Sequence, residues 1–379
     1  MFSIVLNIIG TLFHFYVAQR IWRTGLVGSH APARAWWLGV VLLWLVYLAG
    51  VHIGNANSGW RWILGQFSLN WLGILFVMSL CLLAADLATG FGLWWRAHAA
   101  RVRGAAAMAG VALSAFAVYQ SVRAPVVVGY EVAMKNLPPE LDGMTLAMVS
   151  DLHLGTQRGA DWMAARVAQI NALQPAAVLM VGDQVDRDPL GDPRLAGVLQ
   201  GLKAPRGVWA VTGNHEFYGD AETTVSEFAA GGVRWLRNRR VELAPGLVLA
   251  GIEDVGRAMH GGGDITGDLA QLLPATPTQA TILLSHIPAA PLIDMAAARG
   301  VGLMLSGHTH GGQIWPFSYL VQHRFPQLVG QHAIHGMNLV ISRGAGSWGP
   351  RMRLWQAGEI VKITLRAQRQ GPSARGPGA

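Results

Sequence analysis

The first third of the chain contains four long stretches without a charged side chain, and these constrain the fold more than any other feature. They cover residues 1–19, 35–60, 62–85 and 104–122. A helix needs about 20 mostly apolar residues to cross the hydrocarbon core of a bilayer. We therefore expect transmembrane helices near residues 3–19, 36–54, 67–88 and 104–122. A very apolar soluble core is the alternative, but four such runs separated by arginine-bearing loops argue against it.

The chain as a whole is basic, with a formal net charge of +8, but the excess lies almost entirely in this first third. Residues 1–123 contain eight arginines, no lysine or glutamate, and one acid, Asp86, which gives +7 and leaves the remaining residues at +1. A nucleic-acid-binding domain carries its positive charge on a polar, folded face. We therefore expect membrane lipids as partners and no nucleic acid.

The arginines between the predicted helices indicate how the chain crosses the membrane. The first loop holds Arg20, Arg23 and Arg34, the second Arg61, and the third Arg96, Arg101 and Arg103. Because basic loops stay on the cytoplasmic side, we expect the N-terminus and everything after Arg123 on the opposite side of an inner or plasma membrane. Arginines follow residues 1–19 rather than precede them, which favours an uncleaved anchor over a signal peptide.

Small and polar residues inside these stretches predict how the helices pack. Ala106, Gly110 and Ser114 recur every four residues in the fourth helix, a spacing that suits close helix packing. His14 and Asp86 are single polar groups near predicted helix ends, where we expect them at the membrane interface.

From about residue 124 the pattern changes to short apolar runs between helix-like segments, which predicts a second, α/β domain over residues 124–366. Runs that are apolar on both faces predict buried strands at 144–150, 176–182, 207–213, 280–285 and 302–307. Further strands are expected at 247–252, 338–343 and 359–365, and a helix over 159–173. Residues 367–379 predict a disordered tail.

Each of the five buried runs ends in side chains that bind metals or transfer protons. Asp151 and His153 follow the first run, Asp183 and Asp186 the second, Asn214 and His215 the third, His286 the fourth, and His308 and His310 the fifth. Ligand sites of open α/β sheets lie beyond the carboxyl ends of the strands, so we expect these side chains to meet. The i, i+2 pairs would point to one side of an extended chain. Imidazole, carboxylate and amide ligands without cysteine favour Mn, Fe or Zn.

In these residues the chain resembles the calcineurin-like metallophosphoesterases. The family's five motifs occur in order: D-x-H at 151–153, G-D-x-x-D at 182–186, G-N-H-E at 213–216, an isolated histidine at 286, and G-H-x-H at 307–310. The similarity covers about residues 125–366 and looks closest to a subgroup that often carries an N-terminal membrane anchor. It implies a multi-pass helical membrane region followed by an αββα sandwich of two mixed sheets.

The chain departs from this family's pattern in two places. His286 is followed by Ile287 where many relatives have asparagine, and residues 257–268 are rich in glycine. Neither departure touches a ligand position, so both concern contacts with the substrate and leave the expected metal site intact.

The resemblance also implies a role for each residue. Asp151, His153 and His310 would bind one metal, Asn214, His286 and His308 a second, and Asp183 would bridge the two. A hydroxide shared by the metals would attack phosphorus. His215 would stabilise the transferring phosphoryl group or protonate the leaving oxygen, and Asp186 would orient His215 through a hydrogen bond.

The expected function is that of a membrane-anchored, dinuclear-metal-dependent phosphoesterase. One alternative is a pyrophosphohydrolase acting on a lipid-linked nucleotide sugar such as UDP-diacylglucosamine, which some relatives hydrolyse. A membrane anchor fits that amphiphilic substrate, whereas the predicted orientation away from the cytoplasm does not. Another alternative is a non-catalytic metal-binding or transport protein. Against it, every expected ligand is present, and four spans with one acid make a poor permeation path.

Overall fold

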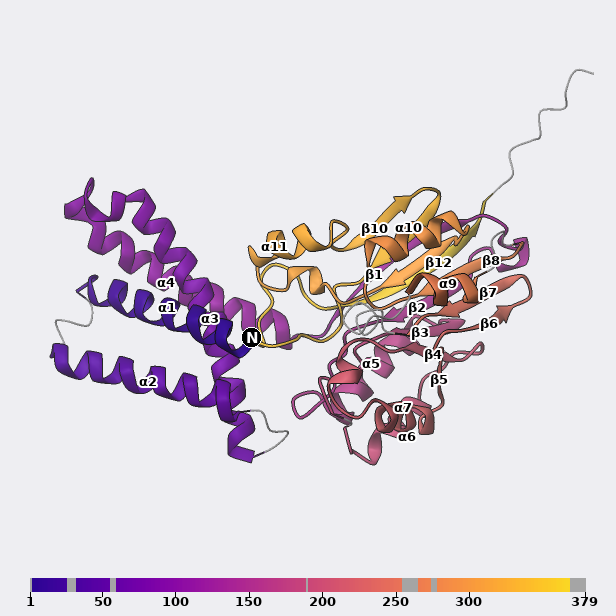
Figure 1. The fold of residues 1–379 in the computed structure, drawn as a ribbon, viewed down its shortest axis with the longest axis horizontal. Coiled ribbons are helices and arrows are strands. Elements are labelled where there is room, and N and C mark those ends of the chain that lie inside the picture. The colour runs from indigo at the N-terminus through magenta and orange to yellow at the C-terminus, as the bar shows by residue number, and fades with distance from the viewer. Residues whose placement is uncertain are drawn as a thin grey trace, which may run out of the picture. The chain divides into compact units, whose positions relative to one another are not determined.

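The computed structural model describes residues 2–25, 32–54, 59–188, 190–253, 265–273 and 278–368 (Figure 1). Most of the glycine-rich segment 257–268 and nearly all of the expected tail 367–379 lie outside these residues. By their contacts the residues form two compact units. The membrane unit comprises residues 1–124, 313–315 and 347–357, and the sandwich unit comprises residues 125–312, 316–346 and 358–379.

The membrane unit contains the four long apolar helices that the sequence predicts. They are α1 (Phe2–Trp22), α2 (Ala33–Ile53), α3 (Gly59–Ala88) and α4 (Arg96–Val122), each long and apolar enough to cross a bilayer. Helices α3 and α4 begin eight residues earlier than expected. A hydropathy pattern marks only the segment suited to hydrocarbon, whereas a helix also satisfies its backbone hydrogen bonds beyond it.

Small residues bring the helices close together. A Cβ atom on Gly110 of α4 would lie 3.1 Å from the Cα atom of Met78 on α3, and Ser114 is buried on the same face. This confirms the expected packing stripe. Ser68 of α3 donates a hydrogen bond of 2.9 Å to the carbonyl of Tyr47 on α2. Without a hydrophobic driving force in lipid, such close approach and interhelical hydrogen bonds hold helices together.

A buried charge network joins three of the four helices. Asp86 of α3 is fully buried and accepts hydrogen bonds from Arg20 Nε of α1 at 2.5 Å and Arg103 Nε of α4 at 2.8 Å. The hydroxyl of Tyr16 donates a third, at 2.8 Å. His14 is also buried, with its Nε2 atom 2.9 Å from the carbonyl of Val40. Both groups therefore lie buried between helices.

The sandwich unit is built on two mixed six-stranded sheets, which confirms the expected fold class. The first sheet has the order β1-β12-β2-β3-β4-β5 and the second β10-β11-β9-β8-β7-β6. The strands of the first sheet are β1 (Val126–Met134), β2 (Thr145–Val149), β3 (Ala177–Val181), β4 (Val208–Val211), β5 (Val233–Trp235) and β12 (Glu359–Ala367). Those of the second are β6 (Arg239–Ala244), β7 (Leu247–Gly251), β8 (Ala280–Leu284), β9 (Leu303–Ser306), β10 (Gly330–Ile334) and β11 (Met337–Ile341).

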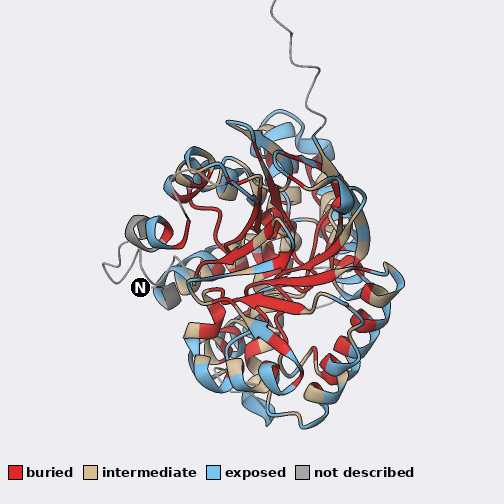
Figure 2. Ribbon diagram, turned by 90° about the vertical axis from the view of Figure 1, so that its right-hand side faces the viewer, coloured by how far each residue is buried: buried red, intermediate tan, exposed pale blue. Residues whose placement is uncertain are grey.

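Helices cover the outer face of each sheet (Figure 1). The described helices of this unit are α5 (Ala160–Ala172), α6 (Arg194–Gln200), α7 (Ala221–Ala230), α9 (Ile265–Leu272), α10 (Ala290–Ala298) and α11 (Phe317–Arg324). On β3, Leu179 and Val181 face the core between the sheets, while Val178 and Met180 pack with side chains of α5, α6 and α7. Residues of α9 and α10 pack on the second sheet in the same way. The central strands β3, β4, β8 and β9 are buried on both faces (Figure 2), as their uninterrupted apolar runs predict.

The sequence-based assignment misses four strands, all at the margins of the sheets: β1, β5, β6 and β10. Strand β6 begins with Arg239 and Arg240, which are exposed, and the residues of β10 are only partly buried. A strand at a sheet edge has fewer apolar neighbours, so its sequence lacks the run by which buried strands are recognised.

Candidate metal centre

Five turns carry the expected site residues, and each directly follows a strand of a parallel pair. Strands β2, β3 and β4 are parallel neighbours in the first sheet, and β8 and β9 in the second. Asp151, Asp183, Asn214, His286 and His308 all lie within three residues of a strand's carboxyl end. Parallel pairing therefore brings turns that are far apart in sequence to one edge of each sheet.

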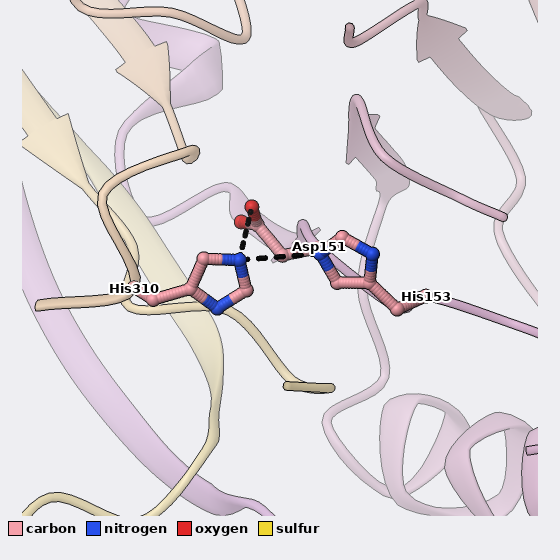
Figure 3. Close-up of side chains that lie close together, drawn as sticks. All are labelled: Asp151, His153 and His310. Carbon is pink, nitrogen blue, oxygen red and sulfur yellow. Dashed lines mark hydrogen bonds and ion pairs between the residues drawn. The ribbon is translucent and has the colours of Figure 1, made fainter. Parts of the chain in front are cut away.

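The first group of converging side chains consists of Asp151, His153 and His310 (Figure 3). The Nε2 atoms of the two histidines lie 3.2 Å apart, and His310 Nε2 is 3.4 Å from Asp151 Oδ1. All three residues are buried. Two imidazole nitrogens and a carboxylate oxygen at such separations match the donor set of a divalent cation.

The second group consists of Asp183, His286 and His308. Asp183 Oδ2 lies 3.1 Å from His286 Nε2. The other ring nitrogen of His286, Nδ1, is 2.9 Å from the carbonyl oxygen of Val181. A carbonyl can only accept, so the proton resides on Nδ1 when the ring is neutral, and Nε2 is free to bind a cation.

Asp183 also faces the first group. Its Oδ2 atom lies 3.9 Å from His153 Nε2, and its Oδ1 atom accepts the backbone N–H of His215 at 3.0 Å. One carboxylate oxygen is thus within 4 Å of a histidine from each group. This is the position that a ligand shared between two cations requires.

Asn214 presents its amide oxygen in the manner expected of a ligand. Its Nδ2 atom donates to the hydroxyl of Tyr218 at 2.9 Å, while its Oδ1 atom is buried and has no hydrogen-bond partner among the described residues. Asp151 Oδ2 is a second buried oxygen without such a partner in this part of the chain. Buried polar atoms without partners are costly. A bound cation would satisfy both oxygens, so the residues present fit a divalent metal.

The backbone at these turns is unusual. Five of the seven expected ligands, none of them glycine, have positive φ angles: 52° at Asp151, 47° at His153, 54° at Asp183, 71° at His308 and 50° at His310. The two i, i+2 pairs do not lie on extended chain, so the prediction from their spacing is wrong. The side chains meet because each turn passes through the left-handed region, which non-glycine residues seldom adopt.

His215 and Asp186 lie beside both groups. His215 is buried with its Nδ1 atom against the backbone carbonyl of Asp186, and its Nε2 atom is 4.0 Å from Asp183 Oδ2. The carboxylate of Asp186 approaches His153 Nδ1 to 3.4 Å and His215 Nδ1 to 3.8 Å. Asp186 therefore holds His215 through its main chain, and its carboxylate lies closer to His153.

The buried charges strongly perturb one another. Burial disfavours ionisation of Asp183, but the charges of His286, His215 and His153 and the hydrogen bond with His286 together outweigh it and hold the pKa of Asp183 well below its usual range. Burial would lower the pKa of His286, yet the charges of Asp183 and Asp151 and the hydrogen bonds with Asp183 and Val181 together raise it to about 10. Burial and the charge of His286 lower the pKa of His308 to about 3. Nearby positive charge therefore stabilises the buried carboxylates. A metal ion that displaces the His286 proton would supply that charge.

Glu216, to which the sequence pattern assigns no role, lies beside the expected ligands Asp183 and Asn214. Glu216 is fully buried. Its Oε1 atom accepts the backbone N–H groups of Gln184 at 2.6 Å and Val185 at 3.2 Å, and its Oε2 atom those of Asp183 at 3.1 Å and Gly213 at 2.6 Å. One carboxylate therefore joins the turn after β3 to the turn after β4. The only available signal was its place in the G-N-H-E motif.

Comparison with known proteins agrees with this geometry. A family model described as calcineurin-like phosphoesterase matches residues 144–312. An uncharacterized metallophosphoesterase of Campylobacter jejuni is 30% identical over 280 residues, which cover 68% of this chain and 69% of that protein. A transmembrane protein with a metallophosphoesterase domain from Danio rerio is 28% identical over 96% of this chain and 89% of its own length.

Two further similarities are more partial. A bovine transmembrane protein with a metallophosphoesterase domain is 31% identical over 278 residues; the match covers 69% of this chain and 62% of the bovine protein's length. Among solved structures, a dimetal phosphatase from Danio rerio is 13% identical, with a TM-score of 0.35, over 54% of this chain and 88% of that chain. Sequence identity over most of a relative's length, the family model and the converging ligand groups together show that the chain belongs to the calcineurin-like metallophosphoesterase family.

Proposed function

We propose that this protein is a membrane-anchored phosphoesterase that hydrolyses a phosphoester with two divalent cations, Mn, Fe or Zn. The observation that carries the proposal is the position of Asp183 Oδ2, which lies 3.1 Å from His286 Nε2 and 3.9 Å from His153 Nε2. A carboxylate oxygen between two groups of buried donors suits a ligand shared by two cations.

We assign the ligands as the family resemblance implies. Asp151, His153 and His310 would hold one cation, Asn214, His286 and His308 the other, and Asp183 both. Bound there, a pair of cations would neutralise charge on the phosphoryl group and lower the pKa of the attacking water. The chain's own contribution is a rigid, buried donor set, because strand ends and left-handed turns fix every ligand before the substrate arrives.

His215 would act on the proton of the leaving group. Its Nδ1 atom must carry a proton, because the carbonyl oxygen of Asp186 can only accept. Burial lowers the pKa of His215, so the resting ring is neutral and its Nε2 atom is the one directed toward Asp183. Nε2 would take up the proton that the attacking water loses and donate it to the leaving oxygen. Asp186 supports this role through its main chain.

The test is metal-dependent hydrolysis of bis(p-nitrophenyl) phosphate by the purified full-length protein. We expect activity with added Mn that chelation removes. Asp183→Asn should lower it by more than about 100-fold, since loss of even an outer partner of a metal ligand costs 10–100-fold. The control is Asp294→Asn, on the exposed surface of α10, which should retain activity. Full activity of Asp183→Asn would refute the proposal.

His215→Ala separates catalysis from metal binding. This variant should bind Mn as the wild-type protein does and lose turnover, because its ring lies beside the expected ligands and is not one of them. Equal loss of metal and turnover would make His215 a ligand and contradict the assignment. A panel of phosphomonoesters, phosphodiesters, nucleotide sugars and phospholipids would then identify the substrate class. Preferential cleavage of UDP-diacylglucosamine would favour the pyrophosphohydrolase alternative.

A further inference from the structure

Two short segments that the sequence places within the phosphoesterase stretch belong by their contacts to the membrane unit. They are residues 313–315 and 347–357. Ile314, Met352 and Leu354 are buried in one apolar cluster with Val77 of α3 and Ala117 of α4. The two segments therefore share one apolar core with helices α3 and α4. A loop that only passed near the helices would not bury its side chains in this way.

Backbone hydrogen bonds fix these segments against the helices. The N–H of Arg353 donates to the carbonyl of Ala117 at 2.8 Å, and the N–H of Arg351 to the side-chain oxygen of Asn70 on α3, also at 2.8 Å. Gln313 joins the two segments, since its carbonyl accepts the N–H of Leu354 at 2.9 Å. Irregular backbone is tolerated at membrane depth only where protein groups satisfy it, and these contacts provide that.

The contacts on α4 show how far the segments extend along the helix. Helix α4 ends at Val122. At a rise of about 1.5 Å per residue, Ala117 lies ~8 Å before that end, and Leu113, which packs on the same cluster, lies ~14 Å before it. The headgroup layer on each side of a bilayer is about 5–8 Å thick. Where the end of α4 meets the outer surface of the headgroup layer, the segments would reach the level where headgroups meet acyl chains.

The outer side of the segments carries large aromatic rings. Trp315, Trp348 and Trp355 are 45%, 43% and 54% exposed. Trp355 lies 5.9 Å, between ring centroids, from Phe116, itself 39% exposed on α4. Tryptophan prefers the membrane interface, where its ring is partly desolvated and its N–H stays near water.

We propose that residues 313–315 and 347–357 form an interfacial membrane-contact surface, with Trp348 and Trp355 seated among lipid headgroups. The occupant is bilayer lipid, because the surface continues the lipid-facing side of α4 through Phe116. In sequence the segments follow directly after Gly312 and Gly346, and Gly346 donates its N–H to the carbonyl of Asp151. The proposal does not depend on the phosphoesterase activity.

The test uses site-directed spin labels on the full-length protein in lipid nanodiscs. Cys81 is the only cysteine, so Cys81→Ser provides the background for Trp348→Cys and Trp355→Cys. Both positions should show a ratio of oxygen to water-soluble nickel chelate accessibility that lies between the ratios of a lipid and a water reference. Val111→Cys, exposed on α4 ~16 Å before its end, is the lipid reference, and Ser226→Cys, exposed on α7, is the water reference.

Two results would overturn the proposal. If both labels match the Ser226 reference, the segments face water. If both exclude oxygen and chelate alike, protein covers the surface, either a second copy or another part of the chain. Because the two tryptophans are substituted one at a time, failure of one variant to fold leaves the other to decide.

Discussion

At the scale of single residues, the site is built from conformations that cost free energy. Each non-glycine residue held in a sparsely populated backbone region costs about 1–3 kcal/mol, and five expected ligands are held in this way. Such strain persists only where surrounding contacts enforce it. Around Asp183, the four backbone N–H groups bound by Glu216 provide those contacts.

Glu216→Gln should therefore weaken metal binding. An amide keeps one acceptor oxygen but turns its NH₂ group toward backbone donors, which loosens the turns that carry Asp183 and Asn214. We expect Mn affinity, measured by titration calorimetry, to fall about 10–100-fold, the range for partners of metal ligands. Glu227→Gln is the matched control, because that carboxylate also accepts two backbone N–H groups, those of Leu190 and Gly191, outside the site.

Thermal unfolding shows whether Glu216 positions the expected ligands or only stabilises the fold. If Glu216→Gln lowers the melting temperature no more than Glu227→Gln does, yet loses Mn affinity, Glu216 is a positioning residue. Unchanged Mn affinity in Glu216→Gln would remove it from any role in the site.

At the scale of elements, the membrane helices depend on close contact and on one buried charge. Gly110→Leu should separate α3 from α4, because a Cβ atom there already lies 3.1 Å from the Met78 backbone. The melting temperature in detergent should fall clearly. Gly39→Leu on α2 is the control, since a Cβ atom at that position meets nothing within 4 Å among the described residues. Equal effects of the two substitutions would contradict this account of the packing.

Substitutions in the charge network around Asp86 should lower the stability of the protein by different amounts. Asp86→Leu leaves Arg20 and Arg103 without their counter-charge, and breaking a buried pair in this way costs about 3–5 kcal/mol. Arg103→Gln keeps the Asp86–Arg20 pair and should cost less. Chemical denaturation in detergent should therefore order the stabilities as wild type, Arg103→Gln, then Asp86→Leu. If Arg103→Gln is less stable than Asp86→Leu, the buried Asp86 charge does not hold the helices together.

At the scale of the whole molecule, the number of spans decides which side of the membrane the sandwich unit occupies. Four helices are long and apolar enough to cross, and the arginine-rich first and third loops predict a cytoplasmic location for those loops. We therefore expect a reporter that is active only outside the cytoplasm to be active when fused after Arg123. The same reporter fused after Arg103 should be inactive. The opposite pattern would reverse the predicted orientation.

The four apolar helices, the strands buried on both faces and the residues that converge on the site could all be predicted from the sequence. Each of these leaves a local signature: an uninterrupted apolar run, or a polar motif where such a run ends. The small residues that recur every four positions in α4 could be recognised for the same reason. The roles assigned to the individual ligands stay predictions.

The remaining features could not be predicted from the sequence, because they depend on partners far apart in the chain. The edge strands β5 and β6, the left-handed turns at the ligands and the role of Glu216 carry no local pattern. Residues 347–357 look like an ordinary loop in sequence, yet their core is shared with Val77 and Ala117. Burial against a distant helix stabilises such a segment without requiring any periodicity within it, so no local reading can reveal it.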